Sequence, residues 1–99
     1  MKSVIHDPEA QCDIFAAVRF YEARRDGLGE HFLRALDATI AKVALNPQMF
    51  ALYEKPVRSC RISGFPYRVL VVEESQFVLV VAVSHLARKP GWWRHRLED

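Results

Sequence analysis

The sequence predicts one α+β domain in which a small antiparallel sheet packs against a helical hairpin, with a short helical turn at the C-terminus. Three observations lead to this fold class. They are two apolar stripes at helical spacing in the first half, a glycine-containing junction between them, and β-rich runs separated by short polar turns in the second half. A chain of 99 residues can form a single hydrophobic core without metals or disulfides. We therefore expect residues 1–99 to form one domain.

The first predicted elements are a short strand over residues 2–5 and a helix directly after it. Asp7 can accept hydrogen bonds from free backbone amides, Pro8 suits the first helical position, and Glu9 meets the positive end of the helix dipole. Gly27 is expected to stop this helix, because glycine readily adopts the left-handed conformation found at helix ends. The stripe expected to face the core is Ala10, Ile14, Ala17, Val18 and Tyr21, widened by Phe15 and Phe20.

A second helix is predicted from about Leu28 to Asn46, where Pro47 ends it because the residue before a proline avoids the helical region. With the glycine turn it completes an αα-hairpin. Residues 48–55 are predicted to be a connector that packs against the core, since they include several apolar side chains. The apolar face of the second helix is Leu28, Phe32, Leu36, Ile40 and Val43, reinforced by Leu33.

Three further strands are predicted in the second half, over residues 57–62, 65–72 and 77–83. Pro66 is expected at the start of its strand, where no ladder donor is needed. The run at 77–83 is apolar on both faces, so we expect it to be central in the sheet and covered on both sides. Residues 90–97 are predicted to form the final helical turn.

The composition narrows the class of protein. The chain is 51% hydrophobic and 26% charged, which is typical of soluble globular proteins. Its longest apolar run is too short to span a membrane and its start has no apolar signal core, so we expect a cytoplasmic protein with no membrane partner. Cys12 and Cys60 are expected to be buried free thiols. Residues 51–99 carry eight Lys/Arg against five Asp/Glu, which favours an anionic partner, or a solvated basic surface, in this half.

No phosphate-binding loop, dinucleotide fingerprint, nucleophile elbow or metal-ligand spacing occurs, so no cofactor and no metal are predicted. Arg68 is the leading candidate for function, because a charge on this strand face needs a partner. The partner is either a phosphate or an internal salt bridge, unless the arginine lies at the margin of the sheet. His85, just after the central strand, is expected to act as an acid or base, or to be a structural histidine bonded to backbone.

Two tryptophans and several cations complete the candidate set. Trp92 and Trp93 are expected either to stack on bases or to cover the core, with one buried and one partly exposed. The remaining cations would neutralise phosphates or lie in solvent. They are Arg58, Arg61, Arg88, Lys89, Arg94 and Arg96.

The order and spacing of several short segments resemble the RelE/ParE family of toxins from type II toxin–antitoxin modules, in its ParE-like plasmid-stabilisation branch. The resemblance implies a βααβββ fold, a function in growth inhibition and a cognate antitoxin protein as partner. The matching segments are Phe20-Tyr21-Glu22, Gly27-Leu28-Gly29-Glu30-His31-Phe32, Asn46-Pro47, Val57-Arg58-Ser59-Cys60-Arg61-Ile62, Phe65-Pro66-Tyr67-Arg68-Val69-Leu70, Ala82-Val83-Ser84-His85 and Arg88-Lys89-Pro90-Gly91-Trp92-Trp93.

The resemblance implies one of two targets. ParE-like members inhibit DNA gyrase by binding, whereas RelE-like members cut mRNA on the ribosome without a metal. Arg68 matches the strand arginine of the ribonuclease pattern, Arg61 and Arg88 match it loosely, and His85 would supply a base. A tryptophan stands where that pattern has a tyrosine, and tryptophan has no hydroxyl to exchange a proton.

We therefore expect a gyrase-directed toxin neutralised by an antitoxin peptide laid along the helices and sheet. An mRNA endonuclease using Arg61, Arg68, His85 and Arg88 is the alternative. The residues expected to bind the target or phosphate are Arg58, Lys89, Trp92, Trp93 and Arg94.

Overall fold

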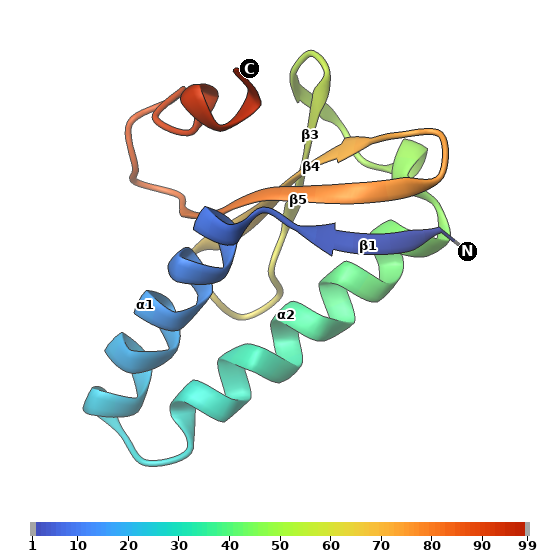
Figure 1. Cartoon of the computed structure of the whole chain (residues 1–99). Helices are drawn as coiled ribbons and strands as arrows, with labels where there is room; N and C mark the ends of the chain where they lie inside the picture. The colour runs from blue at the N-terminus through green and yellow to red at the C-terminus, as the bar shows by residue number, and fades with distance from the viewer. Residues whose placement is uncertain (1, 99) are drawn as a thin grey trace.

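Two helices cover one face of a five-stranded sheet in the computed structural model, which describes residues 2–98, and the C-terminal tail lies on the other side of the sheet (Figure 1). The order across the sheet is β1-β5-β4-β3-β2. The elements are β1 (Ser3–His6), α1 (Pro8–Arg24), α2 (Leu28–Leu45), the 3-10 turn η1 (Pro47–Met49), β2 (Leu52–Glu54), β3 (Val57–Arg61), β4 (Tyr67–Glu73), β5 (Phe77–His85) and the 3-10 turn η2 (Arg94–Leu97).

The predicted α+β fold class, with a helical hairpin on a small sheet, is confirmed, but the sheet is mixed. Strands β2 to β5 pair antiparallel, whereas β1 pairs in parallel with β5. The parallel pairing follows from the direction of β1, which leads straight into the start of α1. There the backbone N–H of Asp7 donates to the carbonyl of Val80 at 2.9 Å. The sheet order therefore brings the first and last strands of the chain side by side.

The helix α1 begins as the sequence predicts. The Asp7 side chain accepts from the backbone N–H of Glu9 at 2.8 Å, and Pro8 occupies the first turn. The predicted contribution of two phenylalanines to the buried stripe is wrong: Phe15 is 66% exposed and Phe20 is 49% exposed. They lie outside the narrow stripe that contacts the sheet, whose buried members are Ala10, Ala17 and Tyr21.

Gly27 and Gly29 allow the two helices to meet closely at their junction. Gly27 has a φ of 85°, a conformation that favours glycine. A Cβ on Gly29 would lie 2.9 Å from the backbone oxygen of Val18, so only glycine fits there without a shift of α1. The Glu22 carboxylate accepts from the N–H groups of both glycines and so binds the open N-terminus of α2.

The second helix buries Phe32, Leu36 and Val43, as its pattern predicts. Leu33, expected to reinforce this face, is instead 36% exposed, because it points beside the stripe and away from the sheet. The buried aromatic rings of the hairpin contact Tyr67 at the start of β4 edge to face. Phe32 lies 5.2 Å from Tyr67 between ring centroids.

Each face of the sheet carries its own core. On the helix side the core includes Val69, Val71, Val78 and Val80. On the other side a smaller cluster surrounds Trp93 and includes Val57, Leu70, Val72, Val81 and Ala82. The strand β5 contributes to both, which confirms the prediction that it is covered on both faces. Trp93 is buried and Trp92 half-buried, also as predicted.

Two other predictions about burial are right only in part. Residues 48–55 include part of η1 and the edge strand β2, and Phe50 packs against the core while the Tyr53 ring lies 6.3 Å from that of the buried Trp93. Leu52 is 54% exposed because β2 lies at the edge of the sheet, and Met49, at the end of η1, is 74% exposed. Both cysteines are free thiols, but Cys12 is exposed on α1, and only Cys60 is buried. Neither helix in residues 2–98 has the length and apolarity needed to cross a membrane.

Candidate functional site

The sheet separates the sequence-predicted candidates onto its two faces. Tyr67 and His85 are directly opposite each other on β4 and β5, and their rings contact at 5.1 Å on the helix side. The next pair along, Arg68 and Ser84, points to the side of Trp93. Arg61 is the register partner of Arg68 on β3 and shares its face. The candidates therefore do not form one cluster.

The outward-facing pair, Arg61 and Arg68, places two like charges directly opposite each other. Arg68 lies 4.8 Å from the centre of the Tyr53 ring, a cation–π contact that holds its guanidinium over the edge strand. Neither arginine forms a salt bridge with another of residues 2–98. Facing like charges are destabilising when nothing neutralises them, so this pair is available to an anion.

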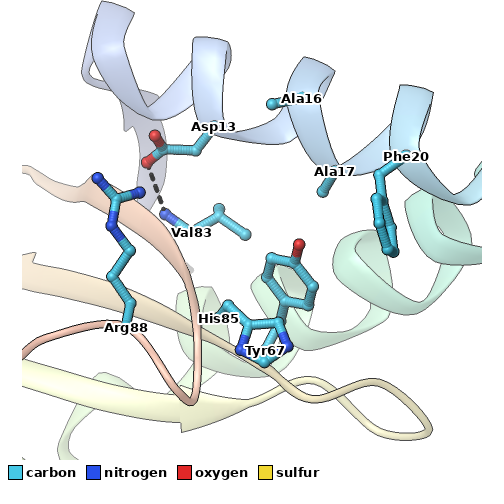
Figure 2. Close-up of a pocket in the computed structure, with 8 residues that line it drawn as sticks. All are labelled: Asp13, Ala16, Ala17, Phe20, Tyr67, Val83, His85 and Arg88. Carbon is cyan, nitrogen blue, oxygen red and sulfur yellow. Dashed lines mark hydrogen bonds between the residues drawn. The ribbon is translucent and has the colours of Figure 1, made fainter.

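A pocket of about 270 Å³ lies on the helix side, between α1 and the ends of β4 and β5 (Figure 2). The face of α1 contributes Asp13, Ala16, Ala17 and Phe20. The other side is formed by Tyr67, Val83 and His85 of the strands and by Arg88, which follows β5. The Tyr67 hydroxyl points toward α1 in this view, while Phe20 forms the wall at one end and Arg88 lies at the other.

His85 and Arg88 are exposed at this pocket and held by local contacts. The backbone N–H of Ala87 donates to Nδ1 of His85 at 3.0 Å, so the neutral ring carries its proton on Nε2. The Arg88 guanidinium lies 3.8 Å from the centre of the Trp92 ring. It forms no salt bridge within residues 2–98. Trp92 in turn donates from Nε1 to the Ser84 hydroxyl at 3.0 Å.

Three other candidates are held by contacts within the chain or by burial. Arg58 donates to the carbonyl of Phe50 at 2.6 Å, and Arg94 forms a two-bond ion pair with Glu54. That pair lowers the pKa of Glu54. Trp93 is 2% exposed in the second core. These contacts favour structural roles for the three sequence candidates, whereas Lys89 is exposed.

An ion pair between Asp13 and Arg96, not predicted from the sequence, attaches the tail to the fold. The guanidinium donates to both Asp13 oxygens, at 2.6 and 3.1 Å, and to the carbonyl of Val81 at 3.1 Å. The carboxylate also accepts from the backbone N–H of Val83 at 3.1 Å. β1 pairs with β5 only as far as Val80. Beyond that point the Asp13 and Arg96 side chains, in place of a neighbouring strand, bond the N–H of Val83 and the carbonyl of Val81.

The Asp13–Arg96 pair is well buried, with side chains 12% and 6% exposed. Burial lowers the pKa of Arg96, but the Asp13 carboxylate, with Glu9 and Asp7 nearby, outweighs burial and holds that pKa above its usual value. The pairing joins residues 83 positions apart, so no periodicity in the sequence could have indicated it. Asp13 on the apolar side of a helix was the one available signal.

Burial also affects two other groups. It raises the pKa of Tyr67, whose hydroxyl therefore stays protonated at neutral pH. It raises the pKa of the Cys60 thiol as well, which makes that cysteine a poor nucleophile. No cluster of three His, Cys, Asp or Glu side chains in residues 2–98 is arranged to hold a metal ion.

The chain is similar to known proteins in both sequence and fold. Residues 4–90 match the model of a family described as the ParE toxin of the type II toxin–antitoxin system parDE. Among solved structures the chain is similar to one titled "Chromosomal ParDE TA system from P. aeruginosa". The TM-score is 0.73 at 12% identity, over 86% of this chain and 96% of the other. No curated protein matches.

Proposed function

The chain belongs to the ParE toxin family of type II toxin–antitoxin systems, and we propose that it inhibits growth by binding DNA gyrase rather than by cutting RNA. The gyrase target is implied by the sequence resemblance to the ParE-like branch. The toxin would be neutralised by a cognate antitoxin protein that covers it. Neither role requires a metal or cofactor.

The observation that carries the binding proposal is the separation of the candidate catalytic residues. Metal-free RNA cleavage needs a base, an acid and phosphate-binding cations around one phosphodiester. Arg61 and Arg68 are on the outer face of the sheet, whereas His85 faces the helices and Arg88 lines the pocket beside α1. Arg61 and Arg68 therefore face the opposite side of β4 and β5 from His85, and this arrangement disfavours one phosphate bound by both sets.

The surface supports an inhibitor that acts through protein contacts. Large apolar side chains are exposed on α1, at the end of α2 and around β2, and side chains of this kind mark a protein-binding surface where they gather into a patch. They include Phe15, Phe20, Leu45, Met49 and Leu52. An antitoxin peptide laid along the helices and sheet would cover the apolar residues of α1.

Expression of the chain without an antitoxin tests the proposal. We expect filamentous cells and a DNA-damage response, together with inhibition of gyrase supercoiling by the purified protein. The control is the same chain co-expressed with its cognate antitoxin, which we expect to be a small acidic protein encoded beside it and which should restore growth. Rapid arrest of translation with cut mRNA would refute the gyrase proposal.

The alternative, an mRNA endonuclease, is favoured by one observation only: the Arg61–Arg68 pair is free of acidic partners within residues 2–98 and open to an anion. It predicts that Arg68→Ala and His85→Ala each abolish toxicity. Full toxicity of both variants would eliminate it, while their loss together with ribosome-dependent mRNA cleavage would establish it.

A further inference from the structure

We propose that the pocket between α1 and the ends of β4 and β5 anchors the antitoxin through a carboxylate that lies next to an apolar side chain. This inference rests on the proposed function, since it assigns the antitoxin a contact point. It follows from the hydrogen-bond donors that line the pocket, from the apolar wall that faces them, and from the volume of the pocket (Figure 2).

The polar groups that the pocket offers are donors. Arg88 presents a guanidinium with no salt bridge inside residues 2–98, and the neutral His85 ring carries its proton on Nε2. The Tyr67 hydroxyl is protonated and points toward α1 across the pocket (Figure 2). The one acid in the pocket, Asp13, already accepts from Arg96 and from the Val83 N–H. A ligand that satisfies this site must therefore bring acceptors, and a carboxylate fits a guanidinium fork with two parallel hydrogen bonds.

The Arg88 guanidinium is already positioned for such a ligand. It stacks on the Trp92 ring at 3.8 Å, and Trp92 is fixed by its bond to Ser84. A stacked guanidinium loses less freedom when it binds than a side chain extended into solvent. The arginine is thus held beside the pocket before any partner arrives.

The remaining wall is apolar and favours a peptide over a free anion. Ala16, Ala17 and Val83 line it, and Phe20 closes one end with half of its surface exposed. At about 270 Å³ the pocket is smaller than the usual range of about 300–1,000 Å³ for small-molecule sites, so it suits one side chain and its backbone. An inorganic phosphate would leave this apolar wall uncovered.

A titration of the whole chain with small probes tests the anchor without using toxicity. The probe is N-acetyl-L-leucine, followed through the backbone amide resonances of residues 13–20 and 83–88. Two matched probes are N-acetyl-L-leucinamide, which has the same side chain and no carboxylate, and inorganic phosphate. We expect the dissociation constant of N-acetyl-L-leucine, measured from these shifts, to be at least about tenfold lower than that of either matched probe. The reason is that a charge-assisted hydrogen bond changes affinity by about one to two factors of ten.

Variants locate the effect within the pocket. Arg88→Gln should weaken binding of N-acetyl-L-leucine about tenfold, Arg88→Lys less, and Tyr67→Phe a few-fold, each with an unchanged near-ultraviolet spectrum. Arg34→Gln removes an exposed positive charge on α2, away from the pocket, and should bind like the wild type. Equal binding of the amide or of phosphate, shifts confined to the Arg61–Arg68 face, or no effect of Arg88→Gln would each overturn the inference.

Failure of the anchor and failure of the proposed function are distinguishable. A chain that arrests growth but does not bind N-acetyl-L-leucine would refute the anchor alone. A chain that binds it at the pocket but does not inhibit growth when expressed without an antitoxin would refute the proposed function alone.

Discussion

Replacing Asp13 with alanine should destabilise the whole protein, because it leaves the Arg96 guanidinium buried without its carboxylate. The two side chains are 12% and 6% exposed, and the carboxylate accepts three hydrogen bonds from Arg96 and the Val83 N–H. Removing one partner of a buried ion pair costs about 3–5 kcal/mol. The remaining solvent contact places Asp13→Ala near the lower end, at about 3 kcal/mol. For a chain of 99 residues that lowers the melting temperature by at least about 12 °C.

Urea unfolding followed by tryptophan fluorescence measures this cost. The matched control is Glu30→Ala, which breaks an ion pair between side chains that are 67% and 76% exposed and should cost less than about 1 kcal/mol. In a double-mutant cycle, Asp13→Ala with Arg96→Met should be less destabilising than the sum of the single changes, since the double variant buries no unpaired charge. A cost for Asp13→Ala no larger than that of Glu30→Ala, or strict additivity, would refute the claim that this pair attaches the tail.

Three further outcomes are expected. Gly29→Ala should cost about 1–3 kcal/mol in urea unfolding, because its Cβ would meet the Val18 oxygen at 2.9 Å, and a change below about 0.5 kcal/mol would contradict that contact. The backbone N–H groups of Gly27 and Gly29 lower the pKa of Glu22, so the stabilisation by its carboxylate is present above the usual pKa and lost as pH falls through the lowered one. Unfolding experiments between pH 7 and pH 3 should therefore show a shallower acid loss for Glu22→Gln than for the wild type, and parallel curves would disprove the cap. Trp93→Ala should cost about 3–5 kcal/mol by emptying the second core, and a native-like urea midpoint would contradict its burial.

Local chemistry explains what the sequence predicted well. Asp7, Pro8 and Glu9 start a helix through short-range bonds that any reader of the sequence can anticipate. The alternation and apolar runs of the second half similarly predicted β3, β4 and β5 and their antiparallel order. Helical periodicity wrongly predicted that Phe15 and Phe20 are buried, because it does not show how wide a face of the helix the sheet covers.

The arrangement of the site depended on contacts that no local pattern contains. The parallel pairing of β1 with β5, the Asp13–Arg96 pair and the placement of Arg88 over Trp92 each join elements that are distant in sequence or separated by a turn. The alternation along β4 did imply that Tyr67 and Arg68 face opposite ways. That His85 shares the face of Tyr67 and not that of Arg68 required the register of β5.

The central claim, inhibition of gyrase by binding, is tested most directly by a supercoiling assay with purified gyrase, relaxed plasmid and this chain. We predict a dose-dependent loss of supercoiling that is reversed by the antitoxin and retained by Arg68→Ala. Full supercoiling at saturating chain, together with cleavage of mRNA on purified ribosomes, would contradict the claim and assign the toxin to RNA.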